Sequence, residues 1–240
     1  MRTAAVAVRV LQQLRRDPRT LVLIVGVPCV LEALLKALFR GGPTFQHAGA
    51  PMLGLFPFVT MFVVTSITML RERVTGTLER LMTLPLGKFD LLAGYGTAFA
   101  VLAAAQAAIV SALAFGLLGL HVAGPQVVVG ALAVANAVLG TALGLFVSAF
   151  AQTEFQAVQF MPATVLPQIL LCGLFVGRGS MATWLRWISD ALPLTYAYDA
   201  LSHTAANTLD GRFAADVAVV CGCIVLALAL GAATLRRRTG

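Results

Sequence analysis

The apolar residues of this chain gather into long runs that are separated by short polar segments. Six runs are long enough to cross a bilayer as a helix, for which about 20 residues are needed. They cover approximately residues 21–39, 52–70, 91–120, 127–150, 160–177 and 217–235. No Asp, Glu, Lys or Arg occurs from Leu91 to Thr153, a stretch that a soluble core could not bury. The pattern predicts an all-α membrane protein with six transmembrane helices in a single domain, residues 1–240.

The N-terminal segment, residues 1–20, has a pattern of its own. Its apolar side chains recur at near-helical spacing among Gln and Arg, at Val6, Val10, Leu11 and Leu14. This spacing is typical of an amphipathic helix that lies on the membrane surface, and Asp17-Pro18 ends it. No small-residue cleavage site follows the first apolar run, so we expect that run to be retained as a helix.

Lys and Arg are distributed unequally between the two ends of the predicted bundle. Twelve lie in the N-terminal segment, the loop 71–90 and the C-terminal segment, whereas four lie in the segments of the opposite side. Cytoplasmic loops carry an excess of Lys and Arg. The distribution therefore predicts a multi-pass protein of the cytoplasmic membrane with both termini in the cytoplasm, which requires an even number of spans.

Composition excludes several classes of function. Hydrophobic residues make up 59% of the chain and charged residues 11%, about half the charged fraction of a soluble domain. The net charge of +7 does not indicate a nucleic-acid partner, because the basic residues flank apolar runs. The four cysteines lie inside apolar stretches and the three histidines are scattered, so neither disulfides nor a metal site are expected.

Motifs of catalysis are missing from the sequence. It contains no GxxxxGK[ST] phosphate-binding loop, no GxSxG nucleophile elbow and no HExxH zinc helix. We therefore expect that the chain is not an enzyme, that it binds no cofactor, and that it cannot hydrolyse ATP by itself.

Few polar groups occur inside the predicted spans. Glu32 and Lys36 lie four residues apart in the first span, where one helical face can pair them. An intramembrane ion pair near the outer end of the span, with Lys36 reaching toward the interface, is favoured over a functional role, which charges at this depth also indicate. Contacts between helices are expected at two amides and a GxxxG pair: Gln106, Asn136, Gly140 and Gly144.

The loop 71–90 contains a second amphipathic pattern. Its apolar residues fall on one helical face, at Val74, Leu78, Leu81 and Met82. Glu72, Glu79 and Arg80 lie elsewhere on the same helix, and Pro85 ends it. The pattern alone fits equally well a helix that contacts a partner and a helix that merely lies at the interface.

The long polar segment 178–216 precedes the last predicted span. Apolar residues recur in it at helical spacing: Met181, Trp184, Leu185, Ile188 and Leu192. Two Trp and two Tyr add the aromatic anchors that are typical of a membrane interface: Trp184, Trp187, Tyr196 and Tyr198. We expect this segment to enter the outer leaflet as short helices without crossing it.

Two of these segments resemble signatures of the type-2 ABC exporter permeases. Residues 72–85 match E-R-x-x-G-T-L-E-x-L-x-x-L-P after the second span. The region with Pro162 and Pro167 and the later Leu192-Pro193-Leu194-Thr195-Tyr196 are similar to the family's other signature. The opening Arg16-Asp17-Pro18-Arg19-Thr20 resembles the daunorubicin-resistance and antibiotic-efflux branch. The outer turn Gly177-Arg178-Gly179 departs from the expected proline-bearing turn.

The resemblance implies roles for particular residues. Residues 72–84 would form a coupling helix seated on a partner ATPase, with the N-terminal helix, about 3–16, beside it. The implied contacts to the ATPase are Glu72, Arg73, Gly76, Thr77, Leu78, Glu79 and Leu81. Residues 180–202 would form re-entrant helices at the exit, with a gate made by Trp184, Trp187, Pro193, Tyr196, Tyr198 and Asp199.

The function that this resemblance implies is ATP-driven export. The chain would pair with a second permease chain, identical or different, and with two nucleotide-binding subunits that hold ATP and Mg. A drug, an antibiotic or another lipid-like compound would be the substrate, and a polysaccharide or lipid-linked glycan is the alternative. A membrane assembly protein without a transport role and an enzyme that acts on lipid are the competing classes.

Overall fold

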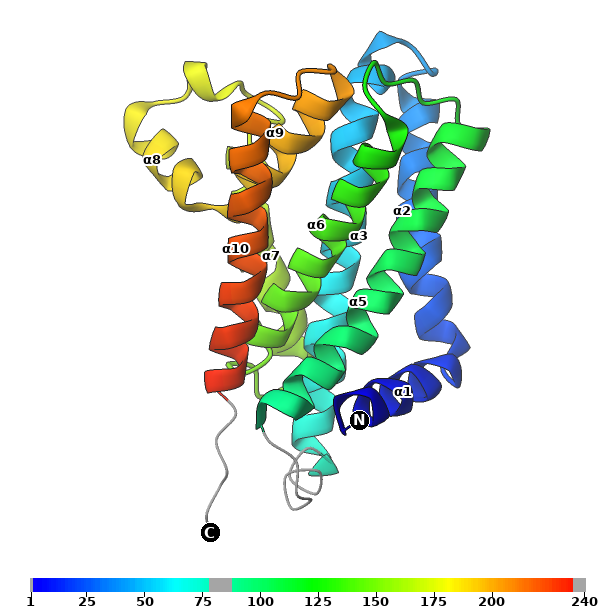
Figure 1. Cartoon of the computed structure of the whole chain (residues 1–240), viewed down its shortest axis with the longest axis vertical. Coiled ribbons are helices and arrows are strands. Elements are labelled where there is room, and N and C mark those ends of the chain that lie inside the picture. Colours follow the sequence, from blue (N-terminus) through cyan, green and yellow to red (C-terminus); the bar gives the residue numbers. More distant parts are fainter. Residues whose placement is uncertain (1, 78–87, 235–240) are drawn as a thin grey trace.

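The computed structural model describes residues 2–77 and 88–234, and every regular element among them is helical (Figure 1). The α-helices are α1 (Arg2–Arg15), α2 (Pro18–Leu38), α3 (Pro43–Val74), α5 (Lys88–Ala112), α6 (Gln126–Val147), α7 (Glu154–Leu171), α8 (Thr183–Ala191), α9 (Pro193–Ala205) and α10 (Gly211–Ala233). A π-helical turn, Leu113–Leu117, extends α5, and a 3-10 turn, Arg178–Ser180, precedes α8. The predicted all-α fold is confirmed for the described residues.

The long helices run along one axis, and the short helices lie at its two ends (Figure 1). α2, α3, α5, α6, α7 and α10 follow the long axis, and α1 lies across the end where α3 finishes and α5 begins. α8 and α9, which follow α7 in the chain, lie at the opposite end, next to the start of α10. We call these the α1 end and the α8 end.

Five helical stretches of the described chain are long and apolar enough to cross a membrane. They are Pro18–Leu38, Pro43–Val74, Ala93–Leu117, Gln126–Val147 and Gly211–Ala233. The predicted fifth span, 160–177, is not among them. Its helix α7 ends at Leu171, because the chain turns at Gly173 with φ of +104°. The helix also carries Glu154 and three glutamines among its 18 residues. The count of six spans is therefore not confirmed.

The connection between α2 and α3 is shorter than the sequence suggests. Residues 40–51 read as an outer loop, but α3 begins at Pro43 and continues through Pro51. Arg40 and Gly41 make the reversal, with left-handed φ values of 51° and 65°. Pro43 stands in the first turn of the helix, where its missing N–H costs no helical hydrogen bond. Pro51 lies inside the helix among buried neighbours, as prolines of membrane helices can.

α6 packs with its backbone close to that of α3. A Cβ atom added at Gly144 would lie 2.6 Å from the Phe62 carbonyl oxygen, and one added at Gly140 would meet the Phe58 carbonyl oxygen. No larger side chain fits at either position without moving a helix. The packing role predicted for this GxxxG pair is confirmed.

The two predicted interhelical amides behave differently. The Gln106 side chain in α5 donates to the Ile24 carbonyl oxygen at 2.8 Å and to the Thr60 hydroxyl at 2.6 Å, so it joins α5 to α2 and α3. Asn136 is buried against Gly54, and its Oδ1 atom has no hydrogen-bond partner. The prediction is therefore confirmed for Gln106 and not for Asn136.

Candidate functional site

α1 is an amphipathic helix whose apolar face packs on the bundle. Val6, Val10 and Leu14 are buried, in agreement with their helical spacing. Contact with α5 is close, since a Cβ atom added at Gly94 would lie 2.6 Å from the Cβ atom of Val6. α1 is thus amphipathic, as the spacing predicts, and its apolar stripe faces the neighbouring helices of the same chain, whereas its position on the membrane surface stays a prediction.

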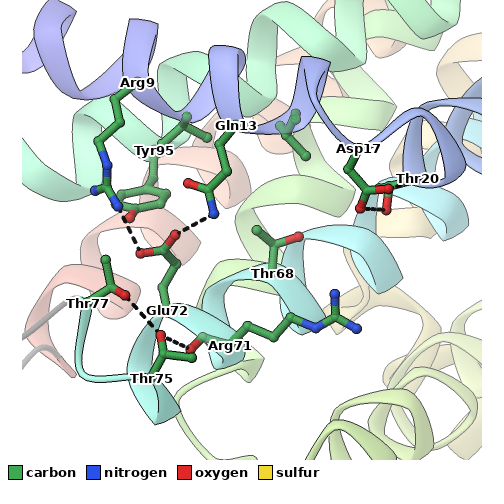
Figure 2. Close-up of a pocket in the computed structure, with 12 residues that line it drawn as sticks. Arg9, Gln13, Asp17, Thr20, Thr68, Arg71, Glu72, Thr75, Thr77 and Tyr95 are labelled. Carbon is green, nitrogen blue, oxygen red and sulfur yellow. Dashed lines mark hydrogen bonds and ion pairs between the residues drawn. The ribbon is translucent and has the colours of Figure 1, made fainter.

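Glu72 lies in the last turn of α3 and points into the protein, toward α1 and α5 (Figure 2). It is only 4% exposed. Its carboxylate accepts a hydrogen bond from the Gln13 amide at 3.0 Å and lies 3.6 Å from the Arg9 guanidinium. The Tyr95 hydroxyl of α5 lies beside both charged groups and has no hydrogen bond of normal geometry. These four residues, Arg9, Gln13, Glu72 and Tyr95, form what we call the Glu72 cluster.

The four residues of the Glu72 cluster line a pocket of about 420 Å³ (Figure 2). We call it the α1 pocket, and its wall combines residues of α1, α3 and α5 with the start of α2. Asp17 lies at its edge, where it accepts from the Thr20 hydroxyl at 2.6 Å and caps α2. These hydrogen bonds from Thr20 lower the pKa of the Asp17 carboxyl.

The end of α3 is fixed by a glycine turn. Gly76 has φ of +70°, a left-handed conformation that glycine adopts without strain. The Thr75 hydroxyl donates to the Arg71 carbonyl oxygen at 2.8 Å and lies 2.9 Å from the Thr77 hydroxyl. No atom of the described residues lies within 4 Å of a Cβ placed on Gly76, so among these residues the turn, and not a close contact, explains the glycine.

A second link ties the end of α3 to α7. The Arg71 guanidinium donates two hydrogen bonds to the Glu154 carboxylate, at 2.6 and 2.9 Å. Glu154 is the first residue of α7, and its hydrogen bond from Arg71 lowers the pKa of its carboxyl. Both side chains are more than half exposed, so solvent weakens the interaction.

The predicted coupling residues divide into two groups. Glu72, Arg73, Gly76 and Thr77 are described, and Leu78, Glu79 and Leu81 lie outside the described residues. α3 ends at Val74 and the left-handed Gly76 follows it, and the remaining residues of the predicted amphipathic face, Leu78, Leu81 and Met82, lie outside the described residues. Glu72 does not offer its carboxylate to a partner in this arrangement, since α1 and α5 cover it. Arg73 is half-buried, and two of its guanidinium nitrogens have no hydrogen-bond partner among the described residues.

The α8 end contains an ion-pair network around Arg178. Its guanidinium pairs with Asp190 at the end of α8 and donates to Asp199 in α9 at 2.9 Å. Burial raises the pKa of the Asp199 carboxyl, and the hydrogen bond from Arg178 opposes this effect. In place of the expected proline-bearing turn, the chain thus uses a 3-10 turn that aims Arg178 at two carboxylates.

The residues of the predicted outer gate do not converge on one point. Trp184 and Trp187 are 61% and 71% exposed on the outer face of α8. The Tyr196 hydroxyl donates to the Asp190 carbonyl oxygen at 2.6 Å, and Asp199 pairs with Arg178. Pro193 opens α9, and Tyr198 packs against the turn at Gly173. The short helices α8 and α9 agree with the expected secondary structure of this segment.

The predicted ion pair between Glu32 and Lys36 is not formed. Both Glu32 carboxylate oxygens are buried, and neither has a hydrogen-bond partner in the described part of the chain. Glu32 faces α3 near Gly49, whereas the Lys36 side chain reaches the turn at Gly41. The two side chains therefore point to different neighbours despite their spacing of four. Among the described residues, no cluster of His, Cys, Asp and Glu could hold a metal ion.

Several residues of the site were missed in the sequence. Arg9 and Gln13 lie four apart in α1, so the helical spacing could have placed both on one face toward a buried acid. The pairings of Arg71 with Glu154, and of Arg178 with Asp190, join residues far apart in the chain and leave no local signal.

Comparison with known proteins gives the family. The family model described as ABC-2 type transporter matches residues 1–205. The chain is 25% identical to "ABC transporter G family member 20" of Dictyostelium discoideum over 150 residues, 62% of this chain and 20% of that protein. It is 26% identical over 148 residues to the "Probable multidrug ABC transporter permease YbhR" of Escherichia coli K12, 62% of this chain and 40% of that protein.

The chain therefore spans less than half the length of these relatives that it matches. The family match, in contrast, covers most of the chain, including α1, the Glu72 cluster and the helices of the α8 end. Together with five apolar helices of spanning length, it shows that this multi-pass membrane protein belongs to the ABC-2 type transporter family.

Proposed function

We propose that this chain is the membrane-spanning permease subunit of an ATP-driven ABC exporter. The observation that carries the proposal is the match of the ABC-2 type transporter model to residues 1–205. ATP and Mg are held by two separate nucleotide-binding subunits, and a second permease chain completes the path across the membrane. The chain itself has no phosphate-binding loop in its sequence, which supports a division of labour between subunits.

In the proposed topology, α7 supplies a sixth span and both termini are cytoplasmic. α7 lies alongside the five apolar helices, between α6 and α8 in the chain (Figure 1). The surplus of Lys and Arg on the side of the α1 end supports a cytoplasmic location for that end, in the cytoplasmic membrane.

Coupling in this proposal uses the segment that follows α3. Glu79 and the neighbouring residues contact the ATPase, and the Glu72 cluster transmits their displacement to α1 and α5. Support comes from the buried carboxylate of Glu72, whose contacts tie the end of α3 to both helices. A displacement of this loop by the ATPase shifts a conformational equilibrium of the permease only if the ATPase binds the loop differently in the two conformations.

The α8 end forms the outer gate in this proposal. α8 and α9 lie across the end of the bundle, and the Arg178 network links them. A drug, an antibiotic or another amphipathic compound of the daunorubicin-resistance type is the proposed cargo. The name of the Escherichia coli relative, a probable multidrug permease, supports this choice.

Co-purification tests the proposal. The tagged chain is isolated from native membranes in mild detergent, and the preparation is assayed for a P-loop ATPase and its activity. Three variants separate the roles: Glu79→Lys for direct contact, Glu72→Gln for the internal cluster, and Arg212→Gln as a charge change in the first turn of α10, at the α8 end.

The expected result is a co-purifying ATPase whose activity falls with Glu79→Lys and Glu72→Gln and not with Arg212→Gln. Loss of the subunit itself in Glu79→Lys would also support direct contact. A chain that purifies alone under several mild conditions would refute the proposal and favour a membrane assembly role.

A further inference from the structure

The α1 pocket lies next to an apolar groove between α2 and α3. The groove has a volume of about 440 Å³, and its walls include Leu23 and Val27 of α2 and Val63 of α3. Thr20, Thr68 and Arg71 line both the pocket and the groove. The two hollows therefore adjoin at these three residues, with the polar one at the α1 end and the apolar one along the bundle.

The polar part of this site contains buried groups that are incompletely hydrogen-bonded. Among the described residues, Arg9 Nη1 has no hydrogen bond; Glu72 Oε2 lies 3.6 Å from Arg9, and the Tyr95 hydroxyl lies beside both groups, but neither oxygen makes a hydrogen bond of normal geometry. Tyr95 is fully buried and Glu72 nearly so. Buried polar atoms almost always find partners, so these atoms indicate a ligand or water that completes them.

The charges around the polar part have a small negative excess. Its wall carries two cations, Arg9 and Arg71, and two anions, Asp17 and Glu72, and the Arg71 guanidinium already donates to Glu154 outside the wall. A headgroup with a single negative charge would meet both carboxylates without compensation. A headgroup with a phosphate and an ammonium group can place each charge near its opposite, as electrostatic complementarity favours.

We propose that the α1 pocket and the α2–α3 groove bind one phospholipid with a zwitterionic, ammonium-bearing headgroup. The head occupies the α1 pocket, and one acyl chain lies in the groove. Both hollows have the size of ordinary ligand sites. The proposal goes beyond transport and requires neither an ATPase nor a particular orientation of the chain, so it stands or falls separately from the proposed function.

Photolabelling of the full chain in nanodiscs tests the site. The discs contain equal parts of phosphatidylethanolamine and phosphatidylglycerol, with a trace of phosphatidylethanolamine that carries a diazirine in one acyl chain. Labelled peptides are identified by mass spectrometry. Val27→Trp fills the groove, and Val30→Trp is the matched control, because Val30 lies in the same helix, is 57% exposed and does not line the groove.

Labelling is expected to concentrate on the groove-lining residues of α2 and α3. Val27→Trp should reduce this labelling by about tenfold, which corresponds to the loss of a modest apolar contact, and Val30→Trp should leave it unchanged. Excess unlabelled phosphatidylethanolamine should compete better than phosphatidylglycerol. A thermal-unfolding scan of each variant establishes that it remains folded.

Three outcomes would overturn the inference. Equal labelling of the wild type and Val27→Trp would mean that only bulk lipid surrounds these helices. Equal competition by unlabelled phosphatidylethanolamine and phosphatidylglycerol would contradict the proposed selectivity for an ammonium-bearing headgroup. A disulfide between the Val27→Cys residues of two copies, formed in the membrane, would show that a second chain covers the groove.

Discussion

The Arg9 guanidinium of α1 lies 3.6 Å from the Glu72 carboxylate of α3, and this contact joins the N-terminal helix to the end of a long apolar helix. The carboxylate is almost fully buried, whereas Arg9 is partly exposed. The stability of the charged Glu72 carboxylate therefore depends on the contact more than that of Arg9 does, because the carboxylate is buried away from water.

Removal of Arg9 should destabilise the chain more than an ordinary surface substitution does. Arg9→Ala leaves the Glu72 carboxylate with the Gln13 amide as its remaining partner. We expect a loss of about 2 kcal/mol in the free energy of unfolding, because a buried carboxylate loses its ion-pair partner and the partial exposure of Arg9 moderates the effect. Thermal unfolding in detergent measures it.

The double variant Arg9→Ala with Glu72→Gln should recover part of that loss, because the unpaired charge is gone. Additive effects of the two changes would contradict the contact.

Gly94 should be intolerant of any side chain. Gly94→Ala places a Cβ atom 2.6 Å from that of Val6, so α1 must move away from α5. Overpacking of this kind costs about 1–3 kcal/mol. Limited proteolysis should then cut α1 faster than in the wild type.

Gly222→Ala is the control for Gly94→Ala, since nothing lies within 4 Å of its added Cβ atom. Equal proteolysis of α1 in both variants would mean that α1 does not depend on Gly94.

Gly76 is expected to act through its backbone conformation. Gly76→Ala meets no atom of the described part of the chain within 4 Å but must adopt a φ of +70°, which costs about 1 kcal/mol for a residue with a Cβ. Gly76→Asn should cost less, because Asn tolerates the left-handed region. Unfolding temperatures should fall in the order wild type, Gly76→Asn, Gly76→Ala.

Gly177→Ala provides the comparison for Gly76, because it has space and a negative φ. A Gly76→Asn variant that is less stable than Gly76→Ala would argue against a conformational role.

The link between Arg71 and Glu154 should make stability depend on acid pH. The pKa of Glu154 is lower in the folded chain than its ordinary value of 4.5, because Arg71 donates hydrogen bonds to the charged form. The stabilisation is therefore complete above 4.5 and is lost as the pH falls through the lower, folded value. Glu154→Gln should reduce this acid-dependent decrease in unfolding temperature, and high salt should weaken the link at neutral pH.

Arg178 should hold α8 in place. In Arg178→Gln, Asp190 and Asp199 lose their shared cation, and Asp199 is left partly buried with an unpaired charge. Hydrogen exchange should accelerate in α8, with little change in α6. Arg186 lies in α8 itself and has no ion pair among the described residues. Arg186→Gln should therefore leave hydrogen exchange in α8 near that of the wild type.

The sequence predicted those parts of the fold that depend on local pattern. Apolar runs located the long helices, and the spacing of Val6, Val10 and Leu14 identified the buried face of α1. The limits of α3 and α7 were less predictable. Pro51 lies inside α3, where buried neighbours surround it, so it does not mark the start of the helix. The left-handed turn at Gly173 ends α7 before the end of its apolar run.

The candidate site was predictable in residue type but not in arrangement. Glu72 was recognised as important, yet its acidic side chain indicated a surface contact, and only the position of α1 explains why it is buried. The partners Gln13 and Tyr95 belong to other helices, and nothing in the local sequence specifies how those helices approach α3. The same reason applies to Glu32 and Lys36, whose neighbours are set by α3 and the turn at Gly41.

The docking of α1 has a consequence for the order of biosynthesis. α1 precedes α3 and α5 in the chain, but its apolar face packs at Gly94 and its Arg9 reaches Glu72. The ribosome therefore makes this helix well before either of its contacts exists. An amphipathic helix can rest on the membrane surface during that interval. The final placement of α1 is then a late step of folding, which waits for the arrival of α5.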